Sequence, residues 1–401
     1  MAAMPVGKRT RYEDAWDRYS REWSERAPGR TALGEEWGTD DLTARIHEKF
    51  LLPHLGPDKR VLEIGPGGGK YSVGVAPHCK ELICADVSHE MLSRVKHRLE
   101  GKGTLLTRKL DGLDLCGVDD ESVDLAFAID VFVHLDLEDI YGYLREFRRI
   151  LVEGGTVVLH FASFLTADGW NLFHREADIN RAQFKQMGRI NLVTPEMVRR
   201  LFEKLRFEAI EIDEEIAPRD FLVRATKPAL PPDPGREDRQ RRILARTGAR
   251  GLHLDLIQRL PSAIIAAPTD DYVARYDFDH GGDRREVLFA HSPARVGFAL
   301  TVPRGASLHT ACALHPEANE RGARGGVLFR IEVNRGMDKK ELFAHVLDPG
   351  AREEDRGWHD LEVSLAPYEG KVIFLVLETA IAEGPNDFNW SGWGEPALVL
   401  R

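Results

Sequence analysis

The stretch VLEIGPGGGKYS, from Val61 to Ser72, decides the fold class of the first half of this chain. Strand-forming residues lead into a loop of four glycines and one proline, and a helix is expected behind the loop. Because glycine has no Cβ atom, the backbone can turn sharply and let a ligand approach its N–H groups closely. A strand, a glycine-rich loop and a helix in this order are typical of nucleotide-binding α/β folds.

Strand and helix patterns alternate around this loop, from Asp40 to Lys227, beginning with a helix that Thr39 or Asp40 would cap. Such alternation predicts an α/β, Rossmann-like sheet, mostly parallel and covered by helices on both faces. The predicted strands lie at 60–65, 81–88, 104–111, 123–132, 156–163, 207–215 and 220–228. The last two are close in sequence and would pair as an antiparallel hairpin at the sheet edge.

A separate helical segment is expected before this domain, within residues 1–39. Trp16, Tyr19 and Trp23 recur at spacings of three and four, which places them on one face of a helix. These aromatic residues would either pack the helix against the domain or form a lid that borders a ligand pocket.

The composition changes twice after Lys227. Residues 228–267 begin with PALPPDPGRED and continue with RQRRILARTGAR, which predicts a linker followed by an arginine-rich helix with a solvated face. Residues 268–401 contain nine or so short alternating runs separated by turns such as HGGD and YEGK. This texture predicts an all-β domain, an antiparallel β-sandwich or jelly roll.

Overall composition limits the function classes. A formal net charge of -10 argues against a general nucleic-acid binder. No run reaches the roughly 18 apolar residues that a membrane helix needs, and charges begin at Lys8, so we expect a cytoplasmic protein without a membrane span. The four cysteines have no CxxC spacing, which indicates neither a zinc site nor a disulfide framework.

Carboxylates stand at the ends of the first three predicted strands. Glu63 lies just before the glycine loop, where a cation or the loop amides would explain a carboxylate on a buried strand. Asp86 ends the second strand and could accept hydrogen bonds from both hydroxyls of a ribose. Asp111 ends the third and could accept from an adenine amine, with Leu113 packed on the ring. The alternative is that these acids merely terminate strands.

Taken together, these motifs resemble the successive motifs of class I S-adenosylmethionine-dependent methyltransferases. The resemblance covers roughly residues 40–227 and rests on the segment 61–69, on Asp86 with Ser88 and Met91, on Asp111-Gly112, and on SVDLAFAIDVFVHL. It implies S-adenosyl-L-methionine as the cofactor, with the glycines at its methionine part, Asp86 at the ribose and Asp111 at the adenine. The residues expected at the cofactor are Glu63, Gly65, Gly67, Gly69, Asp86, Val87, Asp111, Gly112, Leu113, Asp130 and Val131.

Methyl transfer from a sulfonium requires an aligned nucleophile and often a base that removes its proton. The candidate bases are His134 after the fourth strand, His160 in the fifth, and His174 in the insertion that follows. We prefer His134, because the end of the fourth strand faces the methyl group in folds of this kind. Asp130 and His134 could ligate a metal only if they were helical, so no metal site is predicted.

The acceptor class follows partly by exclusion. Amino-methylases of nucleic-acid bases typically carry Pro-Pro-aromatic after the fourth strand, whereas this chain has AIDVFVH, and no cysteine lies there for cytosine C5 methylation. The segments LGEEWG and DVFVHLD also resemble methyltransferases of bacterial glycan and O-antigen synthesis. That resemblance implies O-methylation of a sugar hydroxyl. The alternatives are a non-sugar acceptor, such as a polyketide or peptide, or an NAD-type protein.

The C-terminal sequence resembles jelly-roll modules found beside carbohydrate-active enzymes. The resemblance rests on GWHDLEVSL and NWSGWGEPALVL. Trp358, Trp390 and Trp393 could stack on sugar rings, or they could be core residues of the sandwich. The module would then bind glycan, or it would only mediate packing and homo-oligomer formation.

Overall fold

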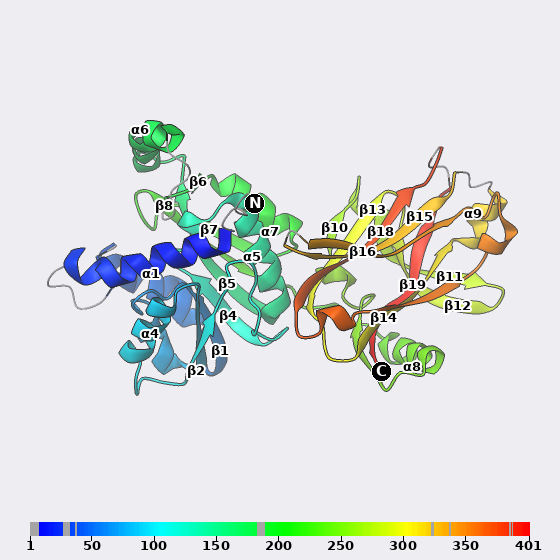
Figure 1. Ribbon diagram of the computed structural model, residues 1–401, viewed down its shortest axis with the longest axis horizontal. Coiled ribbons are helices and arrows are strands. Elements are labelled where there is room, and N and C mark those ends of the chain that lie inside the picture. Colours follow the sequence, from blue (N-terminus) through cyan, green and yellow to red (C-terminus); the bar gives the residue numbers. More distant parts are fainter. Residues whose placement is uncertain are drawn as a thin grey trace, which may run out of the picture. The chain divides into compact units, whose positions relative to one another are not determined.

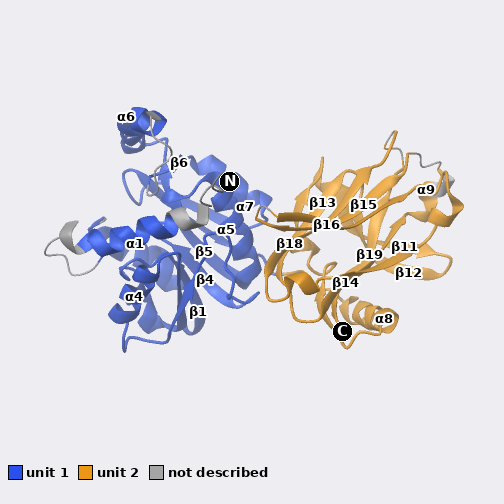
Figure 2. Ribbon diagram, in the orientation of Figure 1, with its two compact units in different colours: residues 1–229 blue, residues 230–401 orange. Residues whose placement is uncertain are grey.

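The computed structural model describes residues 8–26, 33–36, 38–182, 189–321, 325–336, 338–384, 386 and 388–401. The chain divides into two compact units, residues 1–229 and residues 230–401 (Figure 2). Of the expected N-terminal segment 1–39, residues 1–7, 27–32 and 37 lie outside the described residues.

The first unit is built on one mixed sheet with the strand order β3-β2-β1-β4-β5-β8-β7 (Figure 1). Neighbouring strands among β1 to β5 pair in parallel, whereas β8 runs antiparallel to both β5 and β7. The strands are β1 Gly56–Ile64, β2 Cys79–Asp86, β3 Leu105–Lys109, β4 Val123–Ala128, β5 Leu151–Ser163, β7 Glu208–Asp213 and β8 Asp220–Thr226, and the short β6 Leu192–Val193 pairs with the end of β5. The predicted α/β sheet is confirmed, with β7 and β8 as its edge hairpin.

Helices connect these strands, and side-chain caps fix where several of them begin. They are α1 Lys8–Arg26, α2 Asp40–Ile46, α3 Ser72–Val75, α4 His89–Arg98, α5 Leu137–Ile150, α6 Ala167–Ala182 and α7 Pro195–Lys204. Thr39 caps α2, Ser88 caps α4 and Thr194 caps α7, each accepting a hydrogen bond from a backbone N–H of the first turn. The helix expected behind the glycine loop is the single turn α3.

The core of this unit explains where a ligand can bind. Val61, Leu82, Leu125 and Val158 are fully buried in the central strands, as expected for parallel strands covered on both faces. Helix α4 packs on β2 and β3, and α5 packs on β5. With the faces of the sheet closed, the carboxyl ends of β1, β2 and β4 are the open edge, where ligands of α/β sheets bind.

The second unit consists of two antiparallel sheets. One has the order β10-β13-β18-β15-β16, and the other has the order β11-β12-β19-β14-β17 with β9 on β19. The strands are β9 Gly251–Asp255, β10 Ile264–Ala266, β11 Val273–His280, β12 Asp283–Ala290, β13 Ala294–Thr301, β14 Ala306–Leu314, β15 Val327–Arg335, β16 Asp338–Leu347, β17 His359–Ser364, β18 Val372–Ile381 and β19 Ser391–Leu400. Buried side chains of both sheets, including Phe329 and Trp393, form one core, so the all-β, sandwich-like domain is confirmed.

The segment 228–267 contains the expected helix and, in addition, two strands of the β unit. It contributes helix α8 Arg236–Thr247 and the strands β9 and β10, which pair with β19 and β13. Arg239 of α8 is fully buried, and its guanidinium contacts Asp233, Asp255 and Glu286. The arginine-rich composition therefore reflects, at this position, a buried charge cluster that fixes α8 to the β unit. A second helix, α9, spans Pro316–Glu320.

Candidate functional site

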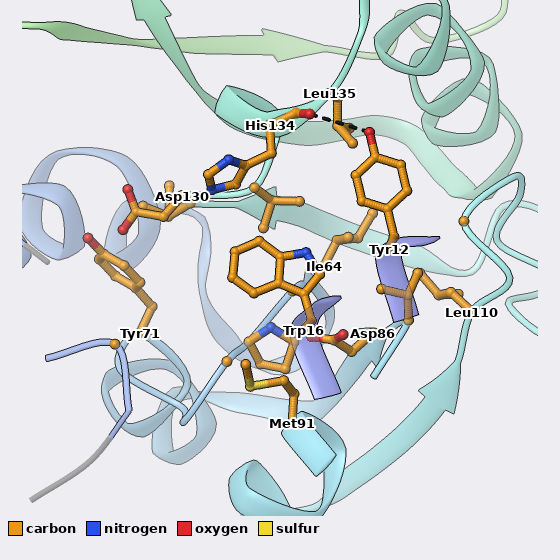
Figure 3. Close-up of a pocket in the computed structure, with 18 of the residues that line it drawn as sticks. Tyr12, Trp16, Ile64, Tyr71, Asp86, Met91, Leu110, Asp130, His134 and Leu135 are labelled. Carbon is orange, nitrogen blue, oxygen red and sulfur yellow. Dashed lines mark hydrogen bonds between the residues drawn. The ribbon is translucent and has the colours of Figure 1, made fainter. Parts of the chain in front are cut away.

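A pocket opens at the carboxyl ends of β1, β2 and β4 in the first unit (Figure 3). It is lined by Tyr12, Trp16, Leu33, Gly34, Ile64, Gly65, Pro66, Gly67, Lys70, Tyr71, Asp86, Val87, Met91, Leu110, Gly112, Ile129, Asp130, Val131, His134, Leu135 and Tyr143. Eight of the residues predicted to bind cofactor or act in catalysis belong to this lining, namely Gly65, Gly67, Asp86, Val87, Gly112, Asp130, Val131 and His134.

The glycine loop forms one wall of the pocket. Gly65 and Gly67 both have positive φ angles, 66° and 54°, which an L side chain rarely adopts. A Cβ atom on Gly65 would lie 2.3 Å from Cγ2 of Val131, so the loop after β1 lies directly against the turn after β4. A Cβ atom on Gly69 would instead point at Val95 of α4, which explains why Gly69 lies outside the pocket lining.

Glu63 supports the loop from behind and is not part of the lining. Its carboxylate accepts a hydrogen bond of 2.5 Å from the hydroxyl of Ser72, at the start of α3, and contacts the thiol of Cys84. Burial raises the pKa of Glu63 to about 7. The structure thus places Glu63 outside the pocket lining, where its contact with Ser72 ties β1 to α3.

One end of the pocket carries Asp86, the last residue of β2. Asp86 is 7% exposed, and one carboxylate oxygen accepts a 2.7 Å hydrogen bond from the backbone N–H of Ser88. Burial raises the pKa of Asp86 to about 7, because little water reaches its charge. Val87 and Met91 line the pocket beside it.

The predicted adenine contacts are only partly assembled. Asp111 accepts hydrogen bonds from the backbone N–H groups of Leu113 and Asp114, 2.9 and 3.4 Å away, and so closes its own turn. Leu113 is 50% exposed, and neither Asp111 nor Leu113 belongs to the lining. Gly112 and Leu110 are the residues of this turn that line the pocket.

Helix α1 contributes Tyr12 and Trp16 to the pocket wall. Hydrogen bonds fix the helix to the rest of the unit: Asp17 accepts from the hydroxyl of Ser88, and Glu36 accepts from both the Tyr19 hydroxyl and the Trp23 indole N–H. The two interpretations of this aromatic face thus divide among its residues. Trp16 borders the pocket, whereas Tyr19 and Trp23 pack the helix.

The other end of the pocket is formed by the turn after β4, which carries Asp130 and His134. Nδ1 of His134 lies 3.2 Å from the carbonyl oxygen of Arg189. A carbonyl only accepts, so the proton of a neutral ring is on Nδ1 and Nε2 keeps its lone pair. The backbone oxygen of His134 accepts from the side chain of Asn191 and from the hydroxyl of Tyr12, the contact drawn in Figure 3.

His160 lies behind this turn and does not line the pocket. Its Nδ1 is 3.1 Å from Oδ1 of Asp130, and its Nε2 is 3.4 Å from Oδ2 of Asp220. Burial by itself lowers the pKa of His160, but the hydrogen bonds and charges of the two carboxylates outweigh burial and raise the pKa to about 9. A ring that carries both protons at neutral pH has no lone pair to accept another, which argues against His160 as the general base.

The third candidate base, His174, lies on α6 with an exposed side chain and is not among the residues that line the pocket. Among the residues that the structure describes, no group of three or more His, Cys, Asp or Glu side chains could hold a metal ion. In the same part of the chain, no helix is long and apolar enough to cross a membrane.

Several lining residues escaped the sequence analysis. Lys70 and Tyr71 follow the glycine loop directly, and their position was the available signal. Ile129 and Tyr143 fall on apolar positions that indicate core, so nothing in the sequence separates them from packed residues. Asp220 does not line the pocket. It begins a predicted strand, and its charge at that position was the available signal for its contact with His160 on β5.

Comparisons with known proteins agree with this geometry. Residues 62–159 match the family model described as a methyltransferase domain. An uncharacterized protein of Archaeoglobus fulgidus is 30% identical over 125 residues, 29% of this chain and 31% of that protein. Nodulation protein S of Rhizobium tropici is 26% identical over 144 residues, 35% of this chain and 60% of that protein. The matched part of this chain thus spans 31% and 60% of the length of these two relatives.

Among solved structures, the N-methyltransferase NodS of Bradyrhizobium japonicum in complex with S-adenosyl-l-homocysteine is 18% identical, with a TM-score of 0.39. The alignment covers 52% of this chain and 99% of that one. The matched family model spans β1 to β5, the strands that carry the pocket. The first unit therefore contains a class I S-adenosylmethionine-dependent methyltransferase domain. The cofactor of this domain is S-adenosyl-L-methionine.

Proposed function

We propose that the protein transfers a methyl group from S-adenosyl-L-methionine to a hydroxyl of a small acceptor, with a sugar hydroxyl as the first candidate. The observation that carries this proposal is the state of His134. The ring lines the pocket, and its Nδ1 lies beside the carbonyl oxygen of Arg189, which favours the tautomer with the proton on Nδ1 and makes Nε2 the basic nitrogen of the ring.

The residues present fit the cofactor. Gly65 and Gly67 both line the pocket, and without Cβ atoms the loop can pack against Val131 and still present bare backbone to a ligand. Asp86 offers a buried carboxylate to the two hydroxyls of a ribose, and these donors would stabilise the charge that burial now disfavours. Asp130 and Val131, beside the loop, would hold the methionyl end.

When bound, the cofactor supplies an electrophilic methyl group on a sulfonium. The acceptor oxygen forms the new O–C bond while the C–S bond breaks, and the electron pair of that bond stays on sulfur. The hydroxyl proton must leave in the same step, because a sugar hydroxyl remains protonated at neutral pH. His134 Nε2 would take this proton, and Trp16, whose ring centroid is 5.2 Å from that of His134, would form the wall beside the acceptor.

A second candidate acceptor is an amine, and one observation favours it. Asp130 presents a carboxylate to the pocket, and the charge of His160 lowers its pKa despite burial, so it could also bind an ammonium group of an acceptor. The related structure NodS is titled an N-methyltransferase. A non-sugar natural product, such as a polyketide or peptide, is the alternative class of acceptor.

For the second unit we infer an assembly role in preference to glycan binding. Trp393 is fully buried in the sandwich core and cannot stack on a ligand. Trp358 is half-buried under the guanidinium of Arg285, and Trp390 is half-buried beside Arg321. None of the three tryptophans offers the open face that sugar stacking requires.

The experiment that tests the proposed function is a calorimetric titration of the full chain with S-adenosylhomocysteine and with NAD. Binding of S-adenosylhomocysteine without binding of NAD is expected, and the reverse would overturn the proposal. A methylation screen over free sugars, glycosylated metabolites, their aglycones and amines, read as release of S-adenosylhomocysteine, then identifies the acceptor class. Turnover on amines alone would favour the second candidate.

A further inference from the structure

Three charged side chains form a row behind the end of the pocket that we assign to the methyl group. Asp130 follows β4, His160 lies on β5 and Asp220 begins β8, and these three strands are neighbours in the sheet. His160 lies between the two carboxylates, 3.1 Å from Asp130 and 3.4 Å from Asp220. Arg219 extends this row of charges, because its guanidinium donates two hydrogen bonds of 2.6 and 2.8 Å to Asp220.

Only one residue of this row faces the pocket. Asp130 lines it and keeps 29% of its side chain exposed, whereas the side chain of His160 is 5% exposed and that of Asp220 is 11% exposed. The charge alternates along this row from Arg219 through Asp220 and His160 to Asp130. The row therefore ends in a carboxylate that faces the pocket.

The backbone of Asp130 also requires a partner to hold it. Its φ angle is 62°, in the left-handed region that non-glycine residues seldom occupy. Nδ1 of His160 lies 3.2 Å from the backbone nitrogen of Asp130 as well as 3.1 Å from its Oδ1. One imidazole thus contacts both the strained backbone and the carboxylate of the same residue. A charged ring donates to the carboxylate, and a neutral ring would accept from the amide.

We propose that His160 is a positioning residue that, braced by Asp220, holds the carboxylate of Asp130 toward the ammonium group at the methionyl end of the bound cofactor. This inference rests on the proposed function. It assigns His160 a role in ligand binding that differs from proton abstraction and from general stability. Lys70 lines the same pocket, and its positive charge also lowers the pKa of Asp130, so the carboxylate stays ionised.

The test compares two ligands that share the nucleoside and the sulfur. S-adenosylhomocysteine carries the ammonium group, and 5′-methylthioadenosine lacks the whole amino-acid end. In calorimetric titrations of the full chain, His160→Gln is expected to weaken S-adenosylhomocysteine by about tenfold to a hundredfold, because a charge-assisted contact is misplaced. Its affinity for 5′-methylthioadenosine should stay within about twofold of the wild type, since misplacing Asp130 leaves the distant nucleoside contacts unchanged.

Two further variants separate positioning from structure. Asp130→Asn should show the same ligand-selective loss, and adding His160→Gln to it should cause no further loss, because both changes remove one interaction. His174→Gln, on the exposed face of α6, is the matched control and should change neither affinity. If His160→Gln does not fold, Asp220→Asn tests the same support from its other side.

Three results would overturn the inference: equal weakening of both ligands by His160→Gln, unchanged affinity for S-adenosylhomocysteine, or additive losses in the double variant. Failure of cofactor binding, on which the proposed function depends, looks different, because the wild type would then bind neither ligand.

Discussion

The two ends of the pocket carry carboxylates whose pKa values are shifted in opposite directions. At the end that we assign to the nucleoside, called the nucleoside end below, Asp86 is buried, and burial raises its pKa to about 7. At the methyl end, burial also acts on Asp130, but the hydrogen bond and charge of His160 outweigh it and lower the pKa. Both residues end or follow parallel strands of one sheet and line one pocket.

This difference indicates how each carboxylate meets its ligand. Asp130 receives its counter-charge from the protein and is ready before anything binds. Asp86 accepts from the backbone amide of Ser88, and the charge of Lys109 also favours its ionised form, but burial outweighs both. A buried acid whose charge is not fully compensated costs stability when ionised, so part of the binding energy at Asp86 must offset that cost.

The largest expected effect removes both ends at once. Gly67→Val places a branched side chain on the wall that the two ends share, at a residue with φ 54°, and should abolish binding of S-adenosylhomocysteine. Gly101→Val is the matched control, because Gly101 has φ 75° and nothing lies within 4 Å of its added Cβ. Circular dichroism should show both variants folded. If Gly67→Val still binds in titration calorimetry, the loop is not the site.

The next effect is confined to the methyl end. His134→Ala should lower turnover by about 10²–10⁴-fold, the usual cost of losing a general base. Cofactor affinity should persist, since Asp86 and the glycine loop are unchanged. His174→Ala provides the comparison on α6 and should keep normal turnover. Near-normal turnover of His134→Ala would mean that the acceptor needs no base, as an amine or an acidic hydroxyl would not.

At the nucleoside end, Asp86→Asn should affect binding and folding in opposite directions. Cofactor binding should weaken by about 1.5–3 kcal/mol, because the ribose hydroxyls lose a charged acceptor. The free protein should melt at a higher temperature at pH 8, because the substitution removes a buried charge that is poorly compensated. Asp130→Asn should instead lower the melting temperature, since it leaves the charge of His160 with one partner fewer.

The same comparison gives a pH dependence for the free protein. The pKa of Asp86 is about 7 in the folded state and roughly 3.9 in an unfolded chain, so the folded state binds the extra proton. Its contribution to stability is fully present below about pH 4 and is lost as the pH rises to about 7. Subtracting the melting curve of Asp86→Asn from that of the wild type isolates this contribution. A difference that grows with pH in favour of the wild type would contradict the sign.

The smallest expected effect tests whether the pocket needs the β unit. All of its lining residues lie between Tyr12 and Tyr143, and the compact units meet at residues 229 and 230. Residues 1–229 and 230–401, produced separately, should each unfold cooperatively, because each holds its own core. The first fragment should keep the cofactor affinity of the full chain. Insolubility of that fragment would show that it depends on the β unit.

Sequence reasoning predicted most of the first unit, because its signals are local. The glycines after β1 and the carboxylate at the end of β2 lie at the ends of strands. Their positions in the fold therefore follow once the strands are recognised. The sequence could not show that Glu63 lies outside the pocket lining, because its partner Ser72 lies behind the loop. The helix expected within 228–267 is present, but the burial of Arg239 could not be predicted, since it depends on carboxylates of other elements.

The sequence by itself determined the α/β class, the antiparallel β texture of the second unit and the cofactor end of the pocket. Only the tertiary structure distinguishes the three histidines, because it places His134 in the pocket lining, His160 behind it and His174 on an exposed face of α6. Nδ1 of His134 faces a carbonyl oxygen because Arg189 approaches from another loop, and the pKa of His160 is raised because Asp130 and Asp220 flank its ring. The proton on an imidazole depends on the groups around it, and these come from segments far apart in the chain. No local sequence pattern could therefore distinguish a candidate general base such as His134 from a candidate positioning residue such as His160.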